Sequence, residues 1–121
     1  MKSGIELITE ERERQVSQEG WTPEHDDEHE GNQIAMAAAC YAAPVSLRAE
    51  IEVPCNCREA MCPHSAFPPT RWVDAWPWDK KFDKRHKHDR LRQLVIAGAL
   101  IAAEIDRLQR QFKLESKEAA E

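Results

Sequence analysis

Hydrophobic side chains recur at helical spacing in three segments, which predict three helices. The first spans about residues 6–19, has few apolar residues and stops at Gly20. The second spans about residues 26–43 and ends before Pro44, and the third spans about residues 89–112. The apolar faces that we expect to pack in the core are Ile34, Ala37, Ala38 and Tyr41 on the second helix, and Leu94, Ile101, Ile105, Leu108 and Phe112 on the third.

A proline-rich insert, residues 44–79, separates the second and third helical segments and holds all but one of the seven prolines. So long a segment without regular structure is unusual in a compact domain and is often functional. A chain of 121 residues is the length of a single domain. We therefore expect one all-α domain over residues 1–121, a small helical bundle in which residues 44–79 form a loop insert.

Composition indicates a soluble protein, because charged residues make up 32% of the chain and mean hydropathy is −0.70. Neither a membrane-spanning apolar stretch nor the pattern of a signal peptide is present, so we expect a cytoplasmic protein without membrane association. The net charge of −5 argues against binding to duplex DNA, which requires a broad basic face. Charge is uneven: residues 1–31 carry ten acidic and three basic side chains, a net charge of −7.

The acidic side chains of the first third of the chain suggest a divalent metal site. Glu11, Gln15 and Glu19 are spaced four residues apart and form one ridge of the first helix. The run Glu24–His29 follows, and a Mg²⁺ or Mn²⁺ ion would relieve its internal repulsion. The alternative is a solvated turn in which Asp26 or Asp27 caps a helix, and the run alone favours this alternative.

Glu104 lies at the edge of the apolar stripe of the third helix, whereas Asp106 points away from that stripe. A carboxylate beside a packed face needs a partner. That partner is either an arginine of a neighbouring helix, such as Arg12, or a metal ion shared with carboxylates of the first two helices. The sequence pattern leaves both possibilities open.

A basic segment follows the insert, with seven lysines and arginines and two aspartates in residues 80–92, a net charge of +5. Beside Trp72, Trp76 and Trp78, such a segment can hold phosphates and stack a base. The alternative, which we favour for the tryptophans on their own, is a solvated loop that its aromatic side chains anchor to the core.

The insert contains a C-x-C-x4-C-x-H arrangement formed by Cys55, Cys57, Cys62 and His64. Three cysteines and one histidine suit a tetrahedral zinc ion, and a loop this rich in proline would gain rigidity from it. The alternative is a set of free thiols on a loop. Cys40, on the alanine-rich second helix, is expected to be a buried small residue.

Two segments, ERERQVSQEGWTPEHDDEHEGNQIAMAAACYA and WPWDKKFDKRHKHDRLRQLVIAGALIAAEIDRLQR, resemble a phage and prophage family of dATP/dGTP diphosphohydrolases. That family is similar to the MazG-like all-α nucleoside triphosphate pyrophosphohydrolases. The resemblance covers residues 8–43 and 72–110, about two-thirds of the chain, and leaves out the cysteine cluster, which would be an added zinc module.

The resemblance implies a helical bundle assembled as a dimer or tetramer, in the host cytoplasm if a phage encodes it. The implied reaction is hydrolysis of a nucleoside triphosphate, dGTP or dATP by the family's name, between the α- and β-phosphates, with Mg²⁺ or Mn²⁺ as cofactor. The acidic motifs of the superfamily correspond to Glu24 and Asp27, and to Glu10 and Glu13 or, by the closer family pattern, Glu11 and Glu19.

Charge and resemblance together give a candidate site, in which the metal ion bridges the acidic residues and the triphosphate. The expected catalytic residues are Glu11, Glu19, Asp27 and Glu104, and the expected metal ligands are Glu24, Asp26, Asp27 and Glu104. The expected substrate-binding residues are Lys87, Arg90, Trp21, Trp76 and Trp78. The competing hypothesis is a non-enzymatic module stapled by zinc, which binds a partner or a nucleotide without hydrolysis.

Overall fold

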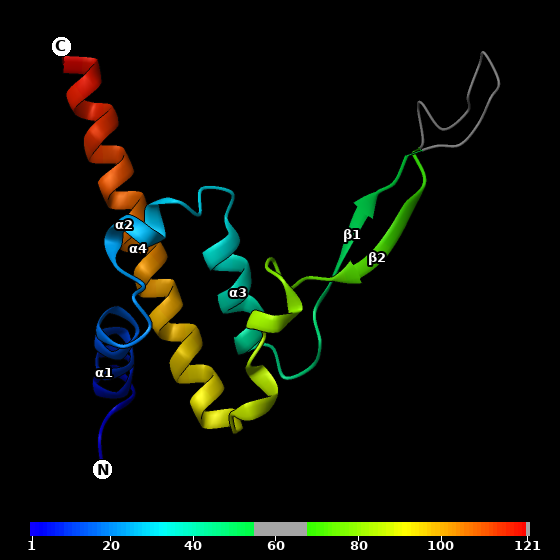
Figure 1. Cartoon of the computed structure of the whole chain (residues 1–121), viewed down its shortest axis with the longest axis horizontal. Coiled ribbons are helices and arrows are strands. Elements are labelled where there is room, and N and C mark those ends of the chain that lie inside the picture. The colour runs from blue at the N-terminus through cyan, green and yellow to red at the C-terminus, as the bar shows by residue number, and fades with distance from the viewer. Residues whose placement is uncertain (55–67, 121) are drawn as a thin grey trace.

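The computed structural model describes residues 1–54 and 68–120, and this part of the chain is mostly helical (Figure 1). The α-helices are α1 (Gly4–Ser17), α2 (Pro23–Asp27), α3 (Gln33–Ala42) and α4 (Arg90–Ala120). The strands are β1 (Arg48–Glu52) and β2 (Thr70–Asp74), and the 3₁₀ turns are η2 (Lys80–Phe82) and η3 (Arg85–Lys87). The long α4 forms the spine of the molecule, with α1 and α3 on different sides of it (Figure 1).

The core lies between α3 and α4 and consists largely of small side chains. Because half of the core residues on each face are alanines, the two helix backbones can approach closely. The buried core residues are Ile34, Ala37, Ala38 and Tyr41 from α3, and Ile96, Ala97, Leu100 and Ala103 from α4. The apolar face predicted for the second helical segment is therefore confirmed.

The prediction that the Leu and Ile stripe of the third helix packs in the core is wrong. Leu94, Ile101, Ile105 and Phe112 are 47%, 49%, 50% and 61% exposed. The helix instead turns its alanine-rich face toward α3, because small side chains allow the closer approach. It also continues to Ala120, beyond the expected end near residue 112.

The segment predicted as one helix over residues 26–43 is two helices. Asn32 adopts the left-handed conformation with φ 62°, which interrupts the helix between α2 and α3. Thr22 caps α2 by accepting a hydrogen bond from the amide of His25, so neither Asp26 nor Asp27 is the N-cap. The short α2 consequently carries both aspartates within its own turns.

The insert is not a structureless loop, because β1 and β2 pair as an antiparallel two-stranded sheet. In the register Arg48 lies opposite Asp74 and Glu50 lies opposite Trp72. The expectation of an all-α fold is corrected to a mostly helical fold with this hairpin, which extends away from the helices (Figure 1). The predicted zinc ligands Cys55, Cys57, Cys62 and His64 lie outside the described residues.

α1 packs against α4 where the side chain of Ile8 lies on Gly98, and the bounds of α1 lie within two residues of those predicted. A Cβ atom placed on Gly98 of α4 would lie 2.5 Å from Cδ1 of Ile8. The glycine is therefore required for the side chain of Ile8 to pack on α4. In the part of the chain that the structure describes, no helix is long and apolar enough to cross a membrane.

Candidate functional site

The ridge predicted on the first helix places two polar side chains in the interior. Glu11 and Gln15 of α1 are 1% and 0% exposed, because their spacing of four residues turns both toward α4. Glu19, the third residue of the ridge, follows the end of α1 and is exposed, where it accepts a hydrogen bond from Arg14 Nη1 at 2.9 Å. Two of the three ridge residues are thus buried and the third is exposed to solvent.

Two arginines neutralise the buried carboxylate of Glu11. Arg14 donates from Nε and Nη2 to its two oxygens at 2.7 and 3.0 Å, and Arg92 of α4 donates to Oε1. Gln15 Nε2 adds a fourth hydrogen bond at 3.2 Å. Burial acts to raise the pKa of Glu11, but the hydrogen bond from Arg14 and the charge of Arg92 outweigh it, so that its pKa lies below the ordinary 4.5.

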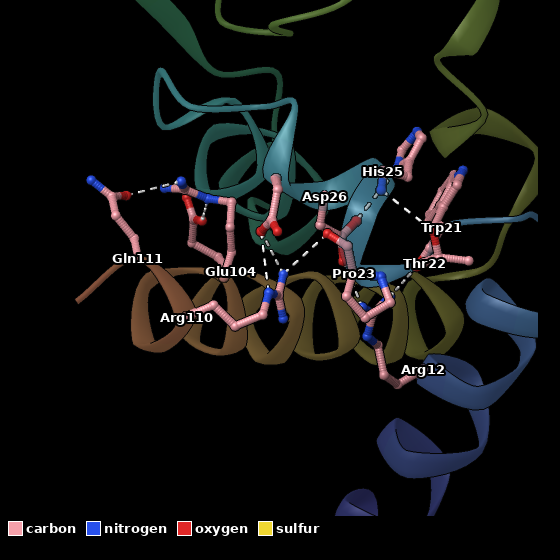
Figure 2. A network of polar contacts seen from close by, with 11 residues as sticks. Arg12, Trp21, Thr22, Pro23, His25, Asp26, Glu104, Arg110 and Gln111 are labelled. Carbon is pink, nitrogen blue, oxygen red and sulfur yellow. Dashed lines mark hydrogen bonds and ion pairs between the residues drawn. The ribbon is translucent and has the colours of Figure 1, made fainter. Parts of the chain in front are cut away.

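The short α2 is held between the other helices by its aspartates (Figure 2). Arg12 of α1 pairs with Asp26 at 2.6 Å and also donates to the carbonyl of Trp21. Arg110 of α4 pairs with the exposed Asp27 at 2.8 Å and donates to the carbonyl of Pro23. The hydrogen bond to Asp27 raises the pKa of Arg110. Asp26 is 3% exposed, whereas Glu24, also a predicted ligand, is solvent-exposed.

Glu104 of α4 is buried, 6% exposed, and its Oε1 accepts a hydrogen bond from the equally buried Arg107 one turn away. Its partner is therefore an arginine of its own helix, while Arg12, suggested from the sequence, pairs with Asp26 instead. The second oxygen, Glu104 Oε2, is buried without a hydrogen-bond partner.

The candidate site therefore contains two orphaned buried acceptors, Glu104 Oε2 and Gln15 Oε1. Carboxylate and amide oxygens are the donor atoms that Mg²⁺ prefers, so the chemistry of these groups fits a hard cation. Among residues 1–54 and 68–120, however, no three His, Cys, Asp or Glu side chains converge closely enough to hold a metal ion. The donor atoms therefore suit a hard cation, but an arginine already donates a hydrogen bond to at least one oxygen of each buried carboxylate.

Aromatic rings form a continuous series beside the site, from α2 to α3. Each ring contacts the next at a centroid distance between 5.0 and 6.4 Å, in the order Trp21, His25, His29, Trp78, Trp76 and Tyr41. Trp76 and Trp78 meet at right angles, 5.6 Å apart, and pack on the core, which leaves no slot for a base between them. The third tryptophan of the insert, Trp72, lies on the hairpin.

The basic segment has partners of its own. Arg90, predicted to bind phosphate, donates to the carbonyls of Tyr41, Ala42 and Ala43 and so caps the C-terminal end of α3. Arg85 pairs with Asp83 at 2.6 Å, and Lys87 is exposed on η3. Arg90 therefore stabilises the fold, and Lys87 is the predicted phosphate ligand that remains exposed.

Sequence reasoning missed three of the four arginines that neutralise the buried carboxylates, and it assigned the fourth to Glu104 instead of Asp26. Arg14 and Arg107 stand three residues from Glu11 and Glu104, a spacing that places two side chains on one helix face. That spacing was a usable signal. Arg92 contacts Glu11 across 81 positions of sequence, so only the fold reveals it. The fourth, Arg12, pairs with Asp26.

Comparisons of the chain with protein-family models, with curated proteins and with solved structures gave no match.

Proposed function

We propose that this chain hydrolyses a purine nucleoside triphosphate, dGTP or dATP, between its α- and β-phosphates in a reaction that depends on Mg²⁺ or Mn²⁺. Water adds to the α-phosphorus and pyrophosphate leaves, so the products are the nucleoside monophosphate and pyrophosphate. This proposal extends the sequence resemblance to a reaction, with the buried polar site as its physical support.

The observation that carries the proposal is the burial of three carboxylates, Glu11, Asp26 and Glu104, on three helices of a small domain. Burying a charged group is costly, and replacing such pairs by apolar residues often leaves stability unchanged or raises it. Fold stability alone therefore gives little reason for three such groups. Two acceptor oxygens without a partner add to this support.

The donors available to a metal ion are the carboxylates of Glu104, Asp26 and Glu11 and the amide oxygen of Gln15, with Glu19, Glu24 and Asp27 at the exposed rim. Because no three carboxylates converge among the described residues, these groups would have to move together to hold the ion. A Mg²⁺ ion bound there would neutralise part of the charge of the triphosphate and activate a water.

Arg14 and Arg92 would supply the cationic groups that bind phosphate oxygens. Their side chains are 34% and 36% exposed, and both donate to the fully buried Glu11. A triphosphate that reached them would compete with Glu11 for their N–H groups and would free its oxygens for a cation. Lys87 would add charge at the rim, and the purine would stack on the exposed parts of Trp21 or Trp78 rather than between Trp76 and Trp78.

The test is an incubation of the full chain with each of the four dNTPs and four NTPs and with Mg²⁺ or Mn²⁺. Ion-exchange chromatography separates monophosphate plus pyrophosphate from diphosphate plus phosphate. We expect monophosphate and pyrophosphate from one or two purine substrates. Diphosphate and phosphate, or no product from a folded protein, would contradict the proposal.

The second candidate is a non-enzymatic module that binds a partner or a nucleotide. One support is that each buried carboxylate is paired with an arginine. The other is the hairpin of β1 and β2, which extends away from the helices and has the Cys/His segment between its two strands in the sequence. It predicts about one zinc ion per chain by elemental analysis and no product from any nucleotide.

A further inference from the structure

Four exposed lysines lie in the segment of 3₁₀ turns that links β2 to the start of α4 (Figure 1). Residues 79–88 of this segment carry five basic and two acidic side chains, a net charge of +3 in a chain whose net charge is −5. In the part of the chain that the structure describes, none of the four lysines lies within ion-pair distance of a carboxylate. The members of this lysine surface are Lys80, Lys81, Lys84 and Lys87.

The backbone that carries the lysine surface is fixed by contacts with the core and with α4. Arg85 Cζ lies 5.2 Å from the ring centroid of Trp76, and Trp76 packs on the core. Arg85 also pairs with Asp83 at 2.6 Å, and Gln93 Nε2 of α4 donates to the carbonyls of Arg85 and His88 at 3.0 and 3.3 Å. The lysines are therefore presented by an ordered backbone, which reduces the conformational entropy that is lost when a ligand binds.

An exposed aromatic ring, that of Phe82, lies among these lysines. The side chain is 57% exposed, and Lys81 Nζ lies 5.1 Å from the ring centroid. A single exposed apolar residue is common and carries no argument by itself. An exposed ring beside ammonium groups without carboxylate partners is different, because single-stranded nucleic acids are bound by stacking a base on an aromatic side chain while basic groups contact the phosphates.

We propose that the lysine surface and Phe82 bind single-stranded nucleic acid without preference for its sequence. Lysine binds phosphate as a point charge, whereas the bidentate contacts that recognise a base edge are typical of arginine. The neighbouring arginines are occupied, Arg85 by Asp83 and Arg90 by the carbonyls at the end of α3. Contacts to phosphate carry no sequence information, and every base has a face that can stack on Phe82.

The extent and chemistry of this surface favour a single strand over duplex DNA and over an acidic peptide. Duplex DNA requires a broad basic face, whereas these lysines span eight residues of an otherwise acidic chain. An acidic peptide would pair with the lysines but would have no group for the ring of Phe82. This binding does not depend on the proposed function, because only Lys87 of these residues has a place at the rim of the triphosphate site.

The test measures the fluorescence anisotropy of a labelled oligothymidylate of about ten nucleotides, titrated with the full chain at several salt concentrations. Four phosphate contacts predict that the logarithm of the binding constant falls with the logarithm of the salt concentration with a slope of about −3. Lys80→Gln/Lys81→Gln removes two contacts, so we expect a slope of about −1.4. Lys113→Gln/Lys117→Gln, which removes two exposed lysines near the end of α4, is the matched control and should keep the native slope. A native chain that does not bind at low salt, or equal slopes for the two variants, would overturn the proposal.

Phe82→Ala tests the contribution of base stacking. We expect this variant to bind oligothymidylate about 10-fold more weakly and to bind a strand of the same length without bases as the native chain does. Phe112→Ala, which removes a ring that is 61% exposed on α4, is the matched control and should bind like the native chain. Circular dichroism checks that each variant is folded. Native affinity in Phe82→Ala, or a duplex of the same length that binds as tightly as the single strand, would overturn the proposal.

Discussion

Arginine side chains compensate the charge of each buried carboxylate. Glu11 is held by Arg14 and Arg92, Asp26 by Arg12 and Glu104 by Arg107. The carboxylate of each pair is buried, so removing all of its arginine partners leaves a buried charge without compensation, which costs about 3–5 kcal/mol. The native arrangement is thus sensitive to the protonation state of Glu11, whose pKa these arginines lower.

Glu11→Gln is expected to make the free energy of unfolding depend less on pH at acidic pH. Because the folded-state pKa of Glu11 lies below 4.5, its charge stabilises the native state above that pH, and this contribution is lost as pH falls through the folded-state pKa. Urea unfolding at fixed protein concentration, at several pH values between about 6 and 3, measures the effect.

The matched control is Glu13→Gln, which removes a solvent-exposed carboxylate from the same helix. We expect this control to follow the native profile, whereas Glu11→Gln should also lose about 2 kcal/mol near neutral pH. A Glu11→Gln profile as steep as the native one would show that this carboxylate does not govern acid stability.

The elements show where periodicity is informative and where it is not. Helical spacing located α1, α3 and α4, but the larger Leu and Ile side chains suggested the wrong face of α4. Close packing of alanines decides which face is buried, and that depends on the partner helix. The hairpin was missed because β1 and β2 are joined by a long connection that carries no short-turn signal.

Gly98→Ala tests the crossing of α1 and α4. Alanine favours helix by about 1 kcal/mol, but its Cβ atom would overlap Ile8, and we expect a net destabilisation of about 1–2 kcal/mol. Thermal unfolding by circular dichroism measures it. Ile8→Ala in the same chain should relieve the overlap and so reduce the effect of Gly98→Ala.

Gly4→Ala provides the control for helix propensity, since a Cβ atom at Gly4 has no neighbour within 4 Å. It should be neutral or slightly stabilising. If Gly98→Ala behaved in the same way as Gly4→Ala, the close approach of the two helices would not be a feature of the protein in solution.

At the scale of the whole molecule, the fold brings acidic and basic segments together. Arg92, from the basic segment, pairs with Glu11 near the start of the chain, as the opposite charges of residues 1–31 and 80–92 made possible. The candidate site was predictable as a set of acidic residues, because their helical spacing is local. The pairing of Arg12 and Arg92 with their carboxylates, and the burial of Asp26 but not Asp27, depend on contacts between helices that the sequence does not encode locally.

The most direct test of the central claim is turnover by Glu104→Gln. Gln retains an acceptor for Arg107 but removes the charge of the orphaned oxygen. Turnover is therefore lost if Glu104 is a metal ligand and retained if Glu104 serves only as the ion-pair partner of Arg107. Asp106→Asn, an exposed neighbour on α4, is the control. We predict that Glu104→Gln keeps its helical circular-dichroism spectrum and loses at least ~100-fold in the rate of monophosphate release, while Asp106→Asn keeps the native rate. Native turnover in Glu104→Gln would contradict the account.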